Sequence, residues 1–271
     1  MPNPILGFVT DGRFEQVLGI ATLLNYLNST SIYDWVKQVW IVTGYNKIND
    51  VENLLRRLFD NFDFHFVIGE IHNDDKYYIQ VGLSNFFRQL PKHQNLFCID
   101  YDHLILNPVF SALDSPEKGV MVSSEFYETI ITESILQKGK VELPDKHFNA
   151  SLILGSANNL CKIGALWDDA YEYLRPIAPQ RNRVEIAFAL AAKRADVVLI
   201  PCNKSIQSNF ALPSLDSYLF HYGGDSKEAK LMKNKLSELA NNYPESTINA
   251  DILNQIHEEL VTTLKSLIIQ N

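Results

Sequence analysis

The first hundred residues alternate between short apolar runs and segments with apolar residues at helical spacing, and this alternation restricts the fold more than any other sequence feature. Apolar runs bounded by turn signals indicate buried strands at 5–10, 39–44, 64–70 and 96–99. The intervening segments indicate helices at 14–28, 51–59 and 76–90. Strands alternating with helices predict an α/β domain with a mostly parallel sheet. In open sheets of this kind, ligands bind at the carboxyl ends of the strands.

The second half of the chain is less regular. Its apolar runs indicate strands at 119–126, 148–156 and 196–201, and its periodic segments indicate helices at 158–174 and 183–194, followed by two long amphipathic helices from residue 225 onward. No Pro/Gly/Ser-rich hinge divides the chain. We therefore expect one catalytic domain over 1–225 and a helical extension over 226–271 that packs on it. The amphipathic helices could also form a homodimer contact.

Charge and composition exclude several classes of protein. The formal net charge is -8 and the pI about 5.4, and no basic patch stands out, so nucleic acid is not an expected partner. No segment has 18 uninterrupted apolar residues and the first residues do not resemble a secretory signal, so we expect a cytoplasmic protein without a membrane span. Three widely spaced cysteines argue against a disulfide framework or a cysteine-based zinc site.

Asp100 and Asp102 follow the apolar run at 96–99, in "NLFCIDYDHLI". Residues i and i+2 of an extended backbone point the same way, so both carboxylates face one point. Two like charges between apolar segments repel each other unless a cation lies there. Mg²⁺ and Mn²⁺ bind one or two carboxylates together with substrate phosphates, which predicts a divalent metal site. The alternative is that both aspartates are turn residues bonded to nearby backbone amides.

Other polar residues near predicted strand ends are candidates, each with a structural alternative. His221, in "YLFHYGG", is either a third metal ligand or a half-buried histidine bonded to backbone. Gly223 and Gly224 would let the backbone approach a diphosphate. Thr10 and Asp11 follow the first strand and would contact a nucleoside or form a turn.

Four further candidates lie on or beside predicted helices. Lys76 and Arg88 precede the aspartates, and either could bind donor phosphate or lie on a solvated helix face. Arg88 is preferred because a guanidinium forks onto phosphate oxygens. Asn149 lies among apolar residues and needs a partner, either a sugar hydroxyl or backbone. Glu185 could bind donor or acceptor sugar, or could be a first-turn carboxylate favoured by the helix dipole.

Several of these segments together resemble the GT-A-type glycosyltransferases, in particular the glycogenin- and galactinol-synthase-like enzymes. "NLFCIDYDHLI" is similar to their strand and Asp-x-Asp signature, and "HFNASLILGS" to their Phe-Asn-(Ser/Ala)-Gly strand. "FVTDGRFEQVLGIATLLNYL" resembles their first strand, donor loop and first helix, "RVEIAFALAAKR" their helix near the acceptor, and "LFHYGG" their late His-x-Gly element. The order and spacing of these segments cover about residues 5–225.

The resemblance implies a GT-A-type, Rossmann-like fold, which has a mixed, mostly parallel sheet flanked by helices, here with a helical C-terminal extension. It implies a metal-dependent transferase that moves a sugar from a nucleotide-diphosphate-sugar donor, foremost a UDP-sugar, to an unidentified acceptor. Mn²⁺ or Mg²⁺ would be held by Asp100, Asp102 and His221. Asn149 and Glu185 would be catalytic positions. The implied donor-binding residues are Thr10, Asp11, Lys76, Arg88, Tyr101, Gly223 and Gly224.

The sequence departs from the family pattern at three points. Ser151 stands where a glycine is usual, Lys227 comes one position late after the histidine with no Pro-Trp, and Glu185 replaces an aspartate with no following glutamine. No strong nucleophile or general base is evident, which favours a retaining displacement without excluding inversion. Two alternatives remain: a nucleotidyltransferase-like enzyme, although "TDGR" is short for its Gly-rich loop, and a catalytically inactive GT-A-like binding module.

Overall fold

The computed structural model describes most of the chain. The described residues are 4–30, 36–69, 81–107, 116, 118–128, 142–178, 180–204, 206–209, 212–213, 217–224 and 226–270. Lys76 and residues 77–80 of the predicted helix at 76–90 lie outside them; in the described part of that segment, 83–89 form the helix α3 (Leu83–Gln89).

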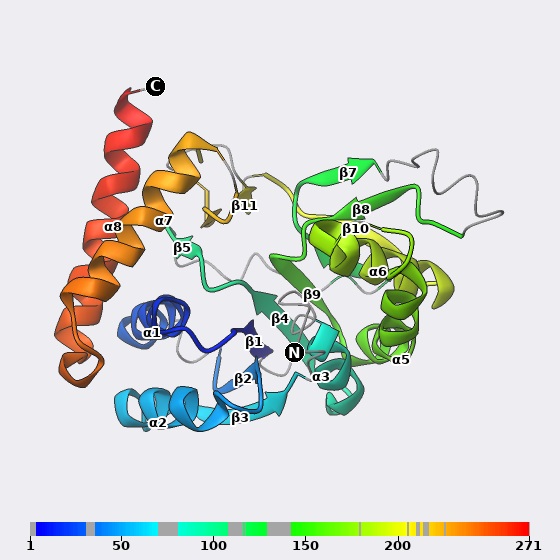
Figure 1. Ribbon diagram of the computed structural model, residues 1–271, viewed down its shortest axis with the longest axis horizontal. Helices are drawn as coiled ribbons and strands as arrows, with labels where there is room; N and C mark the ends of the chain where they lie inside the picture. The colour runs from blue at the N-terminus through cyan, green and yellow to red at the C-terminus, as the bar shows by residue number, and fades with distance from the viewer. Residues whose placement is uncertain are drawn as a thin grey trace.

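The main sheet of the described residues has seven strands in the order β10-β6-β9-β4-β1-β2-β3 (Figure 1). The neighbours β1 and β2, β2 and β3, β1 and β4, and β10 and β6 are parallel, whereas β9 is antiparallel to both β4 and β6. The prediction of a mixed, mostly parallel sheet is therefore confirmed. The strands are β1 (Ile5–Val9), β2 (Gln38–Thr43), β3 (Asp63–Ile68), β4 (Asn95–Ile99), β6 (Val120–Val122), β9 (Leu152–Ser156) and β10 (Leu199–Pro201).

Both faces of this sheet are buried, and successive residues of each central strand serve opposite faces. In β4, for example, Phe97 and Ile99 belong to one apolar core, whereas Leu96 and Cys98 belong to the other. This is why the strands appear in the sequence as continuous apolar runs rather than as an alternating pattern. The sheet is thus the middle layer of three. At its carboxyl edge, the parallel strands end and continue into loops outside the core.

Two groups of helices cover the two faces (Figure 1). The core on one side is shared by α1 (Phe14–Ser29), α2 (Ile48–Leu58), α7 (Lys227–Asn242) and α8 (Ala250–Gln270). The core on the other is shared by α3, α5 (Ala157–Leu174) and α6 (Gln180–Arg194). The C-terminal helices α7 and α8 contact each other and both contact α1, so they contribute to the same core as the sheet.

Two small sheets lie beside the main one and include strands that the sequence did not reveal separately. One has the order β11-β12-β5, formed by β11 (Gln207–Asn209), β12 (Leu219–His221) and β5 (His103–Ile105). The other pairs β7 (Phe126–Glu128) with β8 (Lys146–Phe148). The first matters for function, because it joins the segment after Asp102 to the segment that ends at His221.

Helix boundaries differ from the sequence expectation at one functional residue. α6 begins at Gln180, so Glu185 lies in its second turn and not in its first. This position weakens the interpretation of Glu185 as a carboxylate placed for the helix dipole, since that effect fades beyond the first turn.

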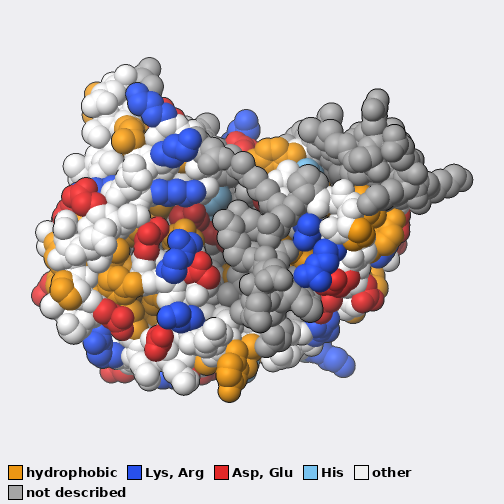
Figure 2. Space-filling model, in the orientation of Figure 1, with side chains coloured by type: hydrophobic (Ala, Val, Ile, Leu, Met, Phe, Trp, Pro, Cys, Tyr) orange, Lys and Arg blue, Asp and Glu red, His pale blue; other side chains and the backbone are white. Residues whose placement is uncertain are grey.

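The described helices contain no stretch that is long and apolar enough to cross a bilayer. On the described part of the face in Figure 2, cationic and anionic side chains are interspersed rather than gathered by sign.

Candidate metal and donor site

Asp100 and Asp102 lie in the turn between β4 and β5, at the carboxyl edge of the main sheet. Backbone hydrogen bonds hold this turn: Asp100 N–H donates to the Ser151 carbonyl at 3.1 Å, and Tyr222 N–H donates to the Asp102 carbonyl at 3.0 Å. The Asp100 side chain is 25% exposed and that of Asp102 only 8%. Neither carboxylate accepts a hydrogen bond from a backbone amide of the described residues, so the structure does not support the turn-residue alternative.

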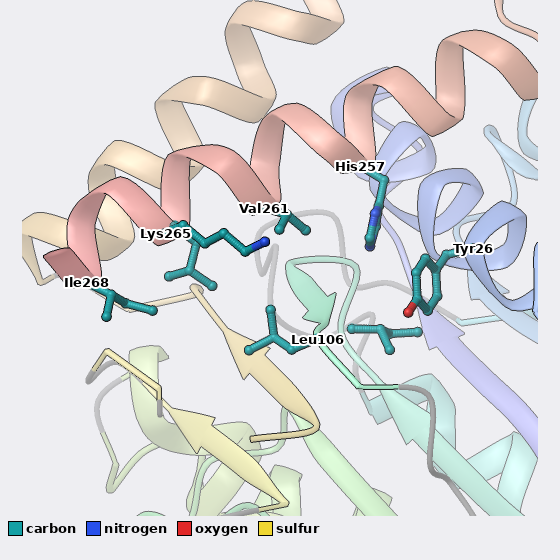
Figure 3. Close-up of a pocket in the computed structure, with 8 residues that line it drawn as sticks. Tyr26, Leu106, His257, Val261, Lys265 and Ile268 are labelled. Atoms are coloured by element: carbon teal, nitrogen blue, oxygen red, sulfur yellow. The ribbon is translucent and has the colours of Figure 1, made fainter. Parts of the chain in front are cut away.

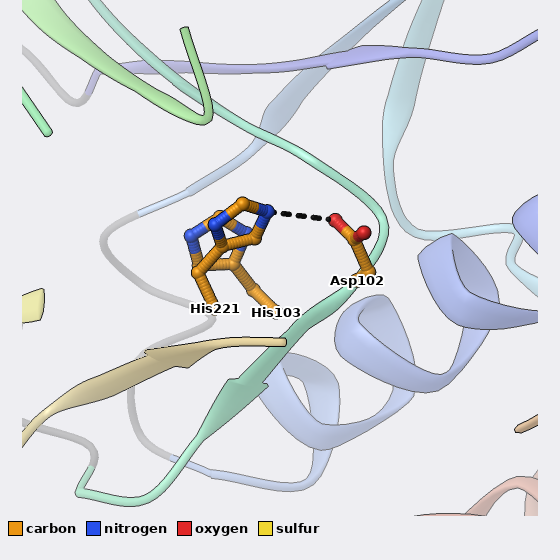
Figure 4. A group of neighbouring side chains, drawn as sticks. All are labelled: Asp102, His103 and His221. Atoms are coloured by element: carbon orange, nitrogen blue, oxygen red, sulfur yellow. Dashed lines mark ion pairs between the residues drawn. The ribbon is translucent and has the colours of Figure 1, made fainter. Parts of the chain in front are cut away.

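His221 is distant in the sequence, but its ring lies beside Asp102 (Figure 4). It ends β12, which pairs antiparallel with β5, and in this register it lies opposite His103. Its Nε2 is 3.2 Å from Asp102 Oδ1 and 3.9 Å from Asp100 Oδ2, and its side chain is 4% exposed. The three side chains that the sequence predicts as metal ligands therefore meet in one place, where Asp102 and His221 are buried and Asp100 is partly exposed.

His103 also belongs to this cluster, but both of its ring nitrogens already have partners. Nε2 lies 2.8 Å from the Gln207 side-chain nitrogen, which can only donate, so Nε2 accepts. Nδ1 therefore carries the proton and donates to the Asp100 carbonyl at 3.0 Å. Burial and the neighbouring His221 lower the pKa of His103 to about 3, so the ring is neutral. The ligand atoms of Asp102, His103 and His221 lie within 4.8 Å of one another, a spacing that could hold a metal ion, but in this arrangement both His103 nitrogens are already bonded.

A buried polar network surrounds His103, and the sequence analysis missed it. The Gln207 amide also donates to Ser151 Oγ at 3.1 Å, and the His103 ring stacks on His221 with centroids 4.6 Å apart and planes 19° apart. Gln207 is fully buried and Ser151 is 1% exposed. Ser151, which stands where the family usually has glycine, is thus a hydrogen-bond partner of Gln207, and Gln207 in turn orients His103. The only sequence signal for this network was the departure at Ser151 itself.

Two observations show that the site fits an added cation. Asp102 Oδ1 is buried and, among the described residues, has no partner that meets hydrogen-bond geometry, although His221 Nε2 is close. Native proteins rarely leave such an atom unsatisfied. A Cβ atom on Gly223 would also collide with His221 Nε2 and lie 2.8 Å from Asp102 Oδ2. The glycine therefore keeps open the space onto which these ligand atoms converge.

The pKa values of the two aspartates shift in opposite directions. Burial and the charge of Asp102 raise the pKa of Asp100 to about 7, although His221 and Lys233 oppose this. Burial also acts to raise the pKa of Asp102, but the charge and close approach of His221, with His103 and Lys233, leave it below its ordinary value. One carboxylate is therefore ionised at neutral pH, and the second is near its midpoint.

Lys233, on α7, brings a cation to the site that the sequence analysis did not identify. Its ammonium group donates to the carbonyls of Gly223 and, at 3.4 Å, Gly224. Its charge acts on both aspartates. The family pattern has a lysine close after the histidine, and Lys227 is the nearest lysine after His221 in the sequence. Lys233 lies less than two helical turns after Lys227, and nothing in its local sequence distinguishes it from the other lysines of α7.

The predicted donor loop after β1 is a tightly bonded turn. Thr10 is 1% exposed; its hydroxyl donates to Gln16 Oε1 at 3.0 Å and accepts from Gly12 N–H at 3.0 Å. Asp11 accepts hydrogen bonds from the Arg13 backbone and guanidinium. These hydrogen bonds are those of a turn, which was the structural alternative for Thr10 and Asp11.

Tyr101 lies between the two aspartates, and its backbone packs closely on Gly19 of α1, where a Cβ atom would be 2.7 Å from the Tyr101 carbonyl oxygen. Burial and the charges of Asp102, Glu15 and Asp100 raise the pKa of its hydroxyl. The hydroxyl therefore stays protonated and can donate a hydrogen bond.

Asn149 and Glu185 are brought together although 36 residues separate them. The Asn149 amide donates to Glu185 Oε1 at 3.2 Å and accepts from Ser151 N–H at 2.9 Å. Because the Ser151 carbonyl also accepts a hydrogen bond from Asp100 N–H, this pair is connected to the turn that carries the two aspartates by a short stretch of chain. Both side chains are partly exposed and so remain accessible to a ligand.

Arg88 lies elsewhere, and the structure does not support the donor-phosphate role expected for it. Its guanidinium donates to Asp168 Oδ2 at 2.9 Å and to the Gly164 carbonyl at 2.9 Å, both on α5. It also donates to Asn85 on its own helix. Arg88 precedes the start of β4, whereas the aspartates follow its end. The guanidinium therefore joins α3 to α5, and Asp168 is its partner rather than a free surface carboxylate.

Comparisons with known proteins support the fold. No family model matches the chain, and no curated sequence does. Among solved structures, it is similar to the galactosyltransferase LgtC in complex with donor and acceptor sugar analogues, with a TM-score of 0.54 and 13% identity over 89% of this chain and 98% of that one. An active-site mutant of LgtC matches with a TM-score of 0.53 and 11% identity over the same shares. The chain therefore has the GT-A-type glycosyltransferase fold that its sequence resemblance predicts.

Proposed function

We propose that this protein is a metal-dependent glycosyltransferase that uses a nucleotide-diphosphate-sugar donor. The single observation that carries the proposal is the buried convergence of Asp100, Asp102 and His221 on a space kept open by Gly223. In a turn or a structural ion pair, a buried carboxylate oxygen would have a hydrogen-bond partner in the protein. Asp102 Oδ1 has none among the described residues, which leaves it available to bind a metal ion.

The ligand set favours Mn²⁺ or Mg²⁺. Carboxylate oxygens suit both ions, and one neutral imidazole shifts the preference towards Mn²⁺. When bound, the ion would neutralise charge that develops on the diphosphate leaving group. Lys233 adds a second positive charge on the same side of the site and holds the backbone of Gly223 and Gly224 in place.

The remaining residues have roles in binding and orientation. Tyr101 offers a protonated hydroxyl beside the carboxylates, and Thr10 and Asp11 form the donor loop at the end of β1. Asn149 and Glu185 form a hydrogen-bonded pair that would position the donor or acceptor sugar. Lys76 remains a proposed donor-binding residue outside the described residues. We propose a UDP-sugar as donor.

The stereochemical course is proposed to be retention. Glu185 already accepts a hydrogen bond from Asn149, so it is suited to bind a hydroxyl group. No side chain of the described residues is assigned as a nucleophile. The leaving diphosphate itself would take up the proton of the incoming acceptor hydroxyl. No observation on the described residues favours the nucleotidyltransferase alternative over this one.

The test is hydrolysis of a panel of nucleotide sugars with and without Mn²⁺. The account expects metal-dependent release of nucleotide diphosphate by the wild type and loss of that release in Asp102→Ala. Arg88→Gln is the matched control, since it also removes one member of an ion pair but lies at the α3–α5 contact. No turnover together with no metal-dependent donor binding would leave the inactive binding module as the better description.

A further inference from the structure

A cavity lies away from the carboxylate cluster, between α1, α8 and β5 (Figure 3). Its volume is about 170 Å³. Leu106, Val261, Leu264 and Ile268 provide aliphatic walls together with Ile105, and the polar groups come from Tyr26, His257 and Lys265. An apolar protein cavity of about 150 Å³ holds benzene, so this one has the size for a single six-membered ring.

His257 provides the unusual feature of this cavity. Its Nε2 is buried and, among the described residues, has no hydrogen-bond partner. Burial lowers the pKa of His257, so its imidazole is neutral, and the buried Nε2 needs a hydrogen-bond partner in either tautomer.

Tyr26 holds this imidazole in place. The two rings stack with centroids 4.3 Å apart and planes 25° apart. Figure 3 shows the His257 ring directed from α8 into the cavity, with the Tyr26 ring beside it. Burial raises the pKa of the Tyr26 hydroxyl, which therefore remains a donor. Lys265 lies at the exposed rim of the cavity, with no ion pair to the described residues, and is a second donor.

These groups discriminate between ligand classes. An ionised carboxylate would lose its hydration against the aliphatic walls, which is unfavourable. A hydroxyl group can donate to Nε2 or accept from it, whichever tautomer the imidazole has, and can also accept from Tyr26 or Lys265. We propose that this cavity is a binding site for a small neutral ring compound with one hydroxyl group, of about the size of phenol. The proposal is independent of the metal site.

The test compares phenol, benzene and benzoate as probes of the full-length protein, with affinities measured by NMR titration. Phenol is expected to bind about fivefold more tightly than benzene, because it satisfies Nε2, and more tightly than benzoate. His257→Phe keeps an aromatic ring for Tyr26 but removes the polar Nε2 atom, so it should bring phenol and benzene to equal affinity. Val261→Phe fills the cavity and should abolish binding of both, whereas Leu231→Phe, at an exposed site on α7, should change neither.

Three results would overturn the proposal: no binding of phenol to the wild type, binding of phenol that survives Val261→Phe in a folded protein, or tighter binding of benzoate than of phenol. The comparison of the three probes on the wild type needs no variant. It therefore decides the ligand class even if the substitutions at Val261 or His257 prevent folding.

Discussion

Two side-chain contacts in the fold, Arg88 with Asp168 and His221 with Asp102, have similar distances but are built differently. Arg88 and Asp168 join α3 to α5 with both side chains more than a third exposed, and hydrogen bonds from Ser84 and to the Gly164 carbonyl complete the arrangement. Asp102 and His221 are 8% and 4% exposed, and one carboxylate oxygen has no hydrogen-bond partner among the described residues. The hydrogen bonds of the Arg88–Asp168 pair are complete, whereas those of the Asp102–His221 pair are not.

The difference separates a structural contact from a binding site. An exposed and fully bonded pair gains little energy and needs nothing more. A buried pair with an unsatisfied oxygen and a second carboxylate nearby is costly unless a further charge completes it. Asp100 provides that second carboxylate, and burial and Asp102 raise its pKa to about 7. The account therefore predicts that substitutions at the second pair change metal affinity, whereas substitutions at the first change stability slightly.

The largest effect is expected for Gly223→Ala. The added methyl group collides with His221 Nε2 and lies against Asp102 Oδ2, so the space for a cation is lost. Mn²⁺ affinity, measured by isothermal titration calorimetry, should fall at least about 100-fold, at the upper end of losses from disturbed metal-site surroundings. Gly224→Ala controls for removing a glycine from the same segment. Unchanged affinity in Gly223→Ala would show that the metal does not lie there.

Gln207→Leu should have the next largest effect. It leaves His103 Nε2 without its donor and removes a partner of Ser151, so the ring that stacks on His221 loses its fixed orientation. Loss of such supporting hydrogen bonds typically reduces metal affinity roughly 10- to 100-fold. Gln207→Glu is the informative comparison, because it keeps the shape but places an acceptor against His103 Nε2. Titration of Mn²⁺ into each variant measures the effect. Affinities equal to that of the wild type would show that the network does not support metal binding.

The pH dependence of metal binding is expected to be about tenfold per pH unit over a limited range. Below its pKa of about 7 the Asp100 carboxyl is protonated, and the proton must leave before the oxygen binds a cation. Mn²⁺ affinity should therefore fall as the pH decreases from about 7 to about 6 and be nearly constant above about 8. Asp100→Asn should bind more weakly but with a flatter profile. A wild-type profile that is as flat as that of the variant would contradict the assignment.

The smallest effect is expected for Arg88→Gln. The lost contact with Asp168 is partly exposed, so the free energy of unfolding should fall by no more than about 1 kcal/mol. Mn²⁺ affinity should change by less than about twofold, because Arg88 belongs to the α3–α5 contact. Chemical denaturation and the same metal titration measure both values. A large loss of donor or metal binding with normal stability would restore the phosphate role expected from the sequence.

The sequence predicted the fold better than the site, for a physical reason. Continuous apolar runs such as the one before Asp100 record burial on both sheet faces, which is a local property of the chain. The antiparallel placement of β9 and the small sheet that joins β5 to β12 depend on long-range pairing, so neither could be read locally. The resemblance to GT-A enzymes nevertheless supplied the correct overall architecture.

Within the site, the sequence predicted residues with a distinctive neighbourhood. Asp100, Asp102 and His221 stand beside apolar or glycine-rich segments, and the structure brings them together. Gln207 and Lys233 have no such neighbourhood, because their importance comes only from what the fold places against them. Arg88 was expected at the site because of its chemistry, but it precedes β4 and is bonded to α5.

The central claim is that a divalent cation, held by Asp102 and His221, is needed for the nucleotide diphosphate to bind. Calorimetric titration of UDP into the metal-free protein, and then into the protein with saturating Mn²⁺, tests this directly. The account predicts binding only with Mn²⁺, and loss of that binding in His221→Ala. UDP that binds equally with and without the metal, or that does not bind in either condition, would contradict it.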